Sequence, residues 1–121
     1  MEIKVINLKE KAELIDTLHS YKRVAVMNDY DFKMVRFNRT FVWHKHPETD
    51  QVFFVVKGTF NIELRDRTLT ITSGDLAVVP KNVEHRPVAK EECTLLLIEP
   101  TNTVNTGDAG GSLTDTDVEW I

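Results

Sequence analysis

The chain has 121 residues, and its 15 Lys and Arg residues against 19 Asp and Glu residues give a formal net charge of −4. This length is that of one domain with a single hydrophobic core, and the lack of a basic excess argues against non-specific nucleic-acid binding. The single Cys excludes an internal disulfide and a zinc site made of several Cys residues. With no signal-peptide pattern and no apolar run approaching the roughly 18 residues of a membrane helix, we expect a cytoplasmic protein without a membrane partner.

The first predicted element is a helix over residues 8–18. Apolar residues at positions 8, 12, 14, 15 and 18 lie close to one helical stripe, with good helix formers between them. Asn7 has a side chain suited to cap this helix, and Glu10 stands three residues later, as in a capping box. The sequence therefore predicts a short helix ahead of the rest of the fold.

From residue 23 onward, short runs rich in Val, Ile, Phe and Thr alternate with turn residues, which predicts strands. The predicted strands lie near residues 23–28, 32–37, 41–46, 51–57, 60–64, 68–72, 76–79, 85–89 and 93–99. About nine short strands with frequent turns indicate an all-β sandwich or barrel. Residues 52–56 and 94–98 are apolar on both faces, so the helix, a terminal segment or a second subunit is needed to cover their outer side.

The composition changes after Pro100. Residues 101–117 are rich in Thr, Asn, Asp and Gly, and the chain closes with the large apolar residues Trp120 and Ile121. Composition alone is compatible with a frayed tail. We favour the alternative, a loop laid over the barrel and held by these two terminal side chains, because an exposed Trp-Ile end is unfavourable.

Two His residues, His44 and His46, stand two positions apart on a predicted strand, so both side chains point to the same face. Imidazoles placed in this way can converge on one metal ion. A hairpin after residues 47–50 would bring Gln51, or less easily Asp50, beside them, and His85 begins another strand. Three His residues and an oxygen donor form a facial metal site with open positions. The alternative interpretation is His residues at the surface or in the core that bind nothing.

These residues resemble the motifs of the cupin superfamily. The first motif, G-x5-H-x-H-x(3,4)-E-x6-G, matches the run from His44 to Gly58, and the second, G-x5-P-x-G-x2-H-x3-N, matches Gly74 to His85. The resemblance implies a small jelly-roll barrel (a double-stranded β-helix), usually dimeric, with a metal inside. We expect a single cupin domain of the cupin 2 type, with a helix and lead-in over 1–22, a β-barrel over 23–99 and a polar segment over 100–121.

The chain departs from the motifs at several positions, including Asn38, Asn82 and Ala89, and the departure with the largest consequence is Gln51. The spacing to Gly58 puts Gln51 where the family commonly has Glu. We expect Gln51 to face inward, as a weak neutral ligand or a hydrogen-bonding group, and Asp50 to point to the opposite face. Three imidazoles and an amide leave the charge of a divalent ion uncompensated, which favours an anionic or enolisable ligand.

Three functions remain open on the sequence. The first is a metal-dependent enzyme, such as a dioxygenase or isomerase, that uses one divalent Fe, Ni, Mn or Zn ion on a small molecule. The second is a non-catalytic module that binds or senses a ligand or metal. The third is a metal-free sugar isomerase or epimerase in which the His residues act as bases. For each we expect a homodimer, because the resemblance implies one.

Overall fold

A computed structural model describes residues 2–116 and 118–121, so one position of the predicted polar segment, residue 117, lies outside the described residues. The chain forms one helix and nine strands within the described part. Their bounds are α1 Leu8–Glu13, β1 Lys22–Met27, β2 Tyr30–Phe37, β3 Gln51–Lys57, β4 Thr59–Glu63, β5 Thr68–Thr72, β6 Leu76–Val79, β7 Arg86–Val88, β8 Cys93–Pro100 and β9 Glu119–Trp120. In this part of the chain no helix is long and apolar enough to cross a bilayer.

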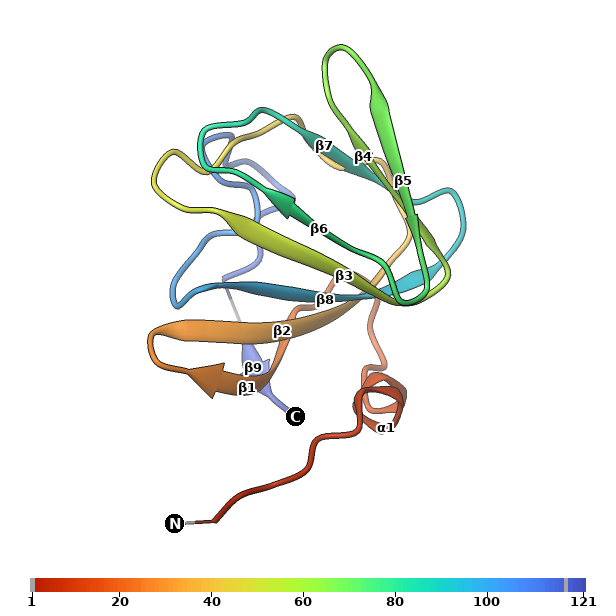
Figure 1. Ribbon diagram of the computed structural model, residues 1–121, viewed down its shortest axis with the longest axis vertical. Helices are drawn as coiled ribbons and strands as arrows, with labels where there is room; N and C mark the ends of the chain where they lie inside the picture. The colour runs from red at the N-terminus through yellow and green to blue at the C-terminus, as the bar shows by residue number, and fades with distance from the viewer. Residues whose placement is uncertain (1, 117) are drawn as a thin grey trace.

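The strands form two sheets that face each other (Figure 1). The larger sheet has the order β6-β3-β8-β2-β1-β9 and the smaller one the order β5-β4-β7. All pairings are antiparallel except that of β9 with β1. The core between the sheets includes the fully buried side chains of Val55, Phe60 and Ile62, which alternate with more exposed residues along their strands. The fold is therefore the predicted all-β jelly-roll barrel with one short helix.

The helix is shorter than predicted. It ends at Glu13 instead of continuing to residue 18, although Asn7 caps it as expected by accepting a hydrogen bond from the Glu10 N–H at 3.0 Å. Beyond the helix, Ile15 is buried against Val24 on the outer face of the large sheet. Contact with that face, rather than continued helical periodicity, sets the path of the chain toward β1.

The predicted strand over residues 41–46 is wrong as a continuous element. Two isolated bridges join this region to the segment around β7, one between Thr40 and Val88 just before residue 41 and one between His44 and His85. Pro87 lies between the two bridges, and its carbonyl accepts a hydrogen bond from the Phe41 N–H at 2.8 Å. Because proline has no N–H to donate in return, the ladder is interrupted there.

The polar C-terminal segment lies over the barrel. Asn105 and Thr106 are 7% and 0% exposed. Asp108 accepts a hydrogen bond from the Lys45 N–H at 2.9 Å through its side chain, and its own N–H donates to the Lys45 carbonyl at 3.1 Å. The predicted covering loop is thus confirmed, but residues 105–108 hold it in place. Of the two terminal side chains expected to anchor it, Trp120 remains 58% exposed, and Ile121 packs partly buried against the cluster of Ile15 and Val24.

Candidate metal centre

Three His side chains meet inside the barrel, as predicted from their spacing. One ring nitrogen each of His44, His46 and His85 lies within 4.8 Å of the other two. The three residues are 2%, 6% and 0% exposed, respectively. Reciprocal backbone hydrogen bonds between His44 and His85, at 3.0 and 2.9 Å, bring together two segments that are far apart in the sequence.

Backbone carbonyls determine which ring nitrogen is free on two of these residues. Nδ1 of His44 lies 2.9 Å from the Val42 carbonyl, and Nδ1 of His85 lies 2.9 Å from the Val83 carbonyl. Because a carbonyl oxygen can only accept, each Nδ1 carries the proton in the neutral ring. The lone pair is then on Nε2, and the same hydrogen bonds fix the orientation of both rings.

Several donor atoms at the His cluster have no partner among the described residues. Nε2 of His46, Nε2 of His85 and Oε1 of Gln51 are buried and have no hydrogen-bond partner within that part of the chain. Buried polar atoms in folded proteins are almost always satisfied, so a water, an ion or another ligand is expected beside these three. Two imidazole nitrogens and an amide oxygen, joined by His44, are donors suited to a divalent transition metal.

Burial also keeps the three rings neutral. It lowers the pKa of His46 to about 4, with the neighbouring His85 and Lys33 contributing in the same direction. Burial likewise lowers the pKa of His85 to about 4, and it lowers the pKa of His44. Metal binding requires unprotonated imidazoles, so at neutral pH no proton has to leave these rings.

The alternation of the backbone separates the two candidate oxygen donors. Gln51 begins β3 and is 2% exposed, and it lines the same cavity as His44. Asp50 is exposed, and its side chain accepts a hydrogen bond from the Lys81 N–H at 2.8 Å. The expectation that Gln51 faces inward and Asp50 does not is therefore confirmed.

Sequence reasoning missed a buried ion pair next to the amide. Nε2 of Gln51 donates to the Glu99 carboxylate at 2.5 Å, and the other carboxylate oxygen lies 2.5 Å from Nζ of Lys33. Glu99 and Lys33 are 1% and 3% exposed. A signal for this pair was present in the sequence, because Glu99 shares a strand face with Cys93, Leu95 and Leu97 and is the one charged residue on it. The NH₂ group of Gln51 thus contacts the carboxylate of Glu99, whose charge Lys33 neutralises.

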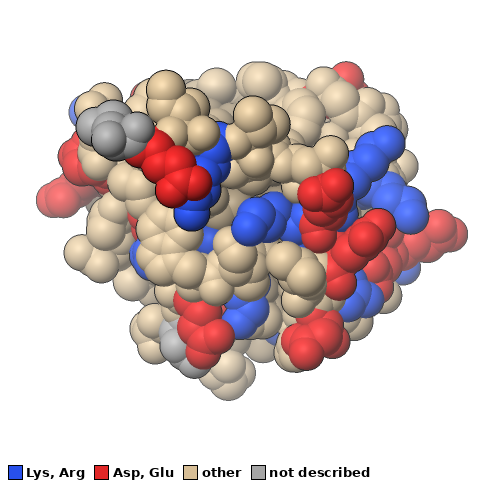
Figure 2. Space-filling view, turned by 90° about the horizontal axis from the view of Figure 1, so that it is seen from below, with Lys and Arg blue, Asp and Glu red and all other residues tan. Residues whose placement is uncertain are grey.

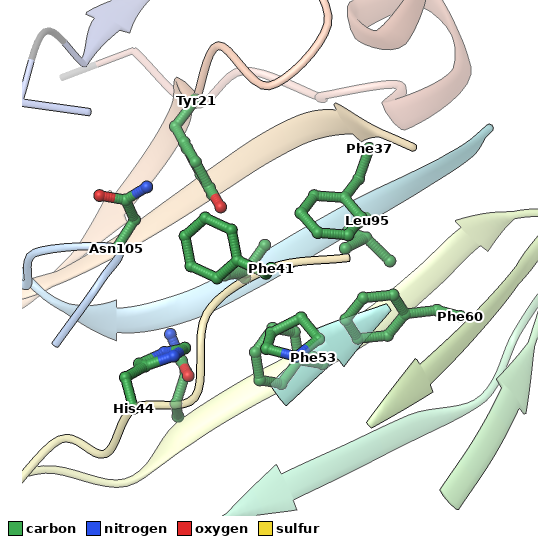
Figure 3. A pocket seen from close by; sticks show the side chains of 11 residues that line it. Tyr21, Phe37, Phe41, His44, Phe53, Phe60, Leu95 and Asn105 are labelled. Atoms are coloured by element: carbon green, nitrogen blue, oxygen red, sulfur yellow. The ribbon is translucent and has the colours of Figure 1, made fainter. Parts of the chain in front are cut away.

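A small cavity lies between the two sheets, with His44 and Gln51 in its wall. Aromatic side chains point into it, Phe53 and Phe60 from the two sheets and Phe41 from the segment before His44, and His44 lies at one end near Asn105 (Figure 3). The cavity offers about 10 Å³ to water-sized molecules, which is room for about one water. A larger molecule can reach the cluster only if side chains or the covering segment move.

The fold and this cluster define a cupin, and comparison with known proteins gives the same class. Residues 34–99 match the cupin domain family, and the chain belongs to that family. Among solved structures, it is similar to a cupin-2 domain containing protein from Shewanella frigidimarina NCIMB 400, with 48% identity and a TM-score of 0.78 over 79% of this chain and 94% of that one. It also resembles protein NMB1881 from Neisseria meningitidis, with 33% identity and a TM-score of 0.73 over 81% and 100% of the two chains.

Two further relatives extend this comparison. KdgF from a Halomonas species shares 31% identity at a TM-score of 0.59, over 68% of this chain and 78% of that one. The uncharacterized protein YdbB of Bacillus subtilis (strain 168) is 29% identical over 84 residues, which are 69% of this chain and 74% of YdbB.

Proposed function

We propose that this cupin binds one divalent transition metal ion through His44, His46, His85 and Gln51, and that it acts as a metal-dependent enzyme on a small anionic or enolisable molecule. Iron, nickel, manganese and zinc all suit these ligands. The observation that carries the proposal is the set of buried, unpartnered donor atoms on His46, His85 and Gln51. A dioxygenase or an isomerase fits a site of this kind.

A bound metal would supply Lewis-acid polarisation of a substrate oxygen. The chain contributes the rest of the site. Carbonyls of Val42 and Val83 hold two of the imidazoles in one tautomer, and the aromatic wall formed by Phe41, Phe53 and Phe60 excludes water. Electrostatic interactions are stronger in such a dry cavity than in solvent.

A second candidate is a non-catalytic module that holds a ligand or metal, and the small volume of the cavity favours it. Space for about one water leaves no room for an organic substrate in this conformation. The metal-free isomerase has less support, because a His with a pKa of about 4, such as His46 or His85, is a weak base at neutral pH.

Elemental analysis of the protein purified without added metal tests the proposal. We expect a near-stoichiometric transition metal in the wild type and a large loss of it in His44→Ala and His85→Ala. The control is His19→Ala, because His19 lies outside the cluster and its Nε2 accepts a hydrogen bond from the Asn38 N–H. Metal-free wild type that also fails to bind added Zn²⁺ or Ni²⁺ would overturn metal binding. Oxygen uptake and isomerisation assays over enolisable acids then separate the enzyme from the binding module.

The proposed partners are a small-molecule ligand and a second copy of the chain, with no nucleic acid and no membrane. On the face shown in Figure 2, acidic and basic side chains are interspersed and separated by uncharged surface. Such a surface produces no extended field of one sign to attract a polyanion. Support for a homodimer comes from exposed apolar residues that include Ile3 and Val5, which are 91% and 97% exposed.

A further inference from the structure

The amide of Gln51 has two possible orientations, and only one of them suits a metal ligand. With Oε1 toward the His cluster it offers a lone pair to a cation, whereas with Nε2 in that place it offers N–H groups that a cation repels. The side chain is buried, so bulk water does not select between the two orientations. A neighbouring group has to select one.

Glu99 is that neighbour. An ionised carboxylate can only accept hydrogen bonds, so the amide must turn its NH₂ group toward it. The hydrogen bond from Nε2 of Gln51 to Glu99 is short, at 2.5 Å, and bonds to an ionised acceptor are shorter and stronger than those between neutral groups. Oε1 of Gln51 consequently faces away from Glu99, where it is buried and has no partner among the described residues.

The position of Glu99 is fixed in turn by Lys33 and by the sheet. Val52 of β3 pairs with Ile98 of β8, so Gln51 and Glu99 lie at the next position along the two paired strands. The second oxygen of Glu99 accepts from Nζ of Lys33, which also donates to the Thr103 carbonyl at 3.3 Å. The carboxylate is therefore held between an ammonium on one side and the amide on the other.

We propose that Glu99, anchored by Lys33, is a positioning residue that makes Gln51 a metal ligand by directing its Oε1 toward His44, His46 and His85. This inference rests on the proposed metal site and adds a specific role for two residues outside it. The substitution Glu99→Gln should reverse the chain of hydrogen bonds. Lys33 would take the new carbonyl oxygen, the new NH₂ group would face Gln51, and Gln51 would turn its own NH₂ toward the metal.

A double-mutant cycle with Gln51→Glu tests this role, since a carboxylate at position 51 presents an oxygen in either orientation. Affinity for Zn²⁺ and Co²⁺ is measured by chelator competition in the wild type, Glu99→Gln, Gln51→Glu and the double variant. We expect Glu99→Gln to lower affinity about tenfold or more in the wild-type background. In the Gln51→Glu background the same change should leave affinity within about a factor of two or raise it.

The conservative variant Glu99→Asp separates orientation from charge. It keeps the ion pair with Lys33, so it protects the fold, but its shorter side chain withdraws the acceptor from Gln51. We expect it to lower affinity in the wild-type background and to change the visible absorption of bound Co²⁺, which reports ligand number. A purely electrostatic or structural role for Glu99 predicts equal losses in both backgrounds of the cycle, and that result would overturn the inference.

The two proposals fail in different ways. If His44→Ala abolishes metal binding while every variant at positions 51 and 99 binds like the wild type, the metal site stands and the positioning role is wrong. If His44→Ala has no effect on binding, the metal site itself is wrong and the positioning role falls with it.

Discussion

At the scale of single residues, the amide of Gln51 joins the proposed metal site to a buried ion pair. It supplies a neutral oxygen where a carboxylate is usual in the family, and its NH₂ group is bound to the buried carboxylate of Glu99. The negative charge is thus present near the cluster, but it lies on Glu99, which contacts the amide of Gln51, and Lys33 balances it. A site built in this way depends on the orientation of one amide.

Gln51→Glu should bind divalent metal more tightly than the wild type, by about tenfold or more, and should be less stable without metal. The introduced carboxylate would lie against Glu99, and two buried like charges repel until a cation is bound. Titration calorimetry with Zn²⁺ and thermal unfolding with and without EDTA measure the two effects. Gln51→Leu, which lacks a donor atom, is the control and should bind more weakly. Equal or weaker binding by Gln51→Glu would show that position 51 does not face the ion.

The His residues should make the stability of the metal-free protein depend on pH. Burial lowers the pKa values of His46 and His85 to about 4, whereas an unfolded His titrates near 6.5. Between these values only the unfolded chain takes up the protons, so the free energy of unfolding falls as the pH drops from about 6.5 to about 4, and these groups add no further loss below that range.

Thermal unfolding of EDTA-treated protein over this pH range measures the dependence. A His46→Gln/His85→Gln variant lacks both groups, so its melting temperature should fall less steeply with acid. If the variant and the wild type lose stability in parallel, the two imidazoles are not the cause and the loss comes from other groups.

At the scale of elements, the covering segment packs directly on the His cluster. It crosses the His44 region at Gly107, which has a φ of +54°. A Cβ there would lie 2.4 Å from the Lys45 carbonyl oxygen and 2.9 Å from Cδ2 of His44. Only glycine allows so close an approach in this backbone conformation.

Gly107→Ala should therefore destabilise the protein by about 1–3 kcal/mol more than Gly110→Ala, because the segment must move away from the cluster. Gly110 is a matched control, since its φ is +62° and a Cβ there would meet nothing within 4 Å. Chemical unfolding gives the difference in stability, and the rate at which EDTA removes the metal should rise only in Gly107→Ala. Equal behaviour of the two variants would contradict close packing of the segment on the site.

At the scale of the whole molecule, the barrel leaves apolar surface that a second copy can cover. Residues 2–7 extend away from the barrel below α1 (Figure 1), and Ile3 and Val5 are almost fully exposed. On the edge strand β6, Leu76 and Val78 are 61% and 54% exposed. Exposed apolar residues on an extended segment and on a sheet edge are features of an interface.

We expect light scattering after size exclusion to give the mass of a homodimer. Ile3→Asp/Val5→Asp should shift the protein toward the monomer, because it places two charges in the contact. Lys4→Glu is the control, since an extended chain points this residue to the opposite side. A wild type that is monomeric at all concentrations, or a dimer that the double variant leaves intact, would contradict this interface.

The local patterns of the sequence predicted much of the fold and of the cluster, and particular residues explain the errors. Strand alternation correctly placed Gln51 inward and Asp50 outward, because side-chain direction on a strand follows from position alone. The helix over 8–18 was too long, since packing of Ile15 on the sheet overrides helical periodicity. The predicted strand over residues 41–46 was wrong because the segment opposite it carries Pro87, which cannot donate a backbone hydrogen bond. Pro87 is far along the chain from this segment, so the local pattern did not reveal the interruption.

By itself, the sequence determined the jelly-roll class and the three His residues, because the motifs join local strand geometry to metal-binding side chains at fixed spacing. Only the tertiary structure decided that Glu99 and Lys33 stand behind Gln51, that backbone carbonyls fix two imidazole tautomers, and that the polar segment after Pro100 closes over the cluster. The contacts of Glu99, of Lys33 and of the polar segment join residues distant in the sequence, and no local pattern specifies which distant group a buried side chain meets. The two carbonyl contacts are local, but they depend on the backbone path that the fold imposes on each His segment. The closing contact at Gly107 is of the same kind, since it depends on two backbones meeting in space.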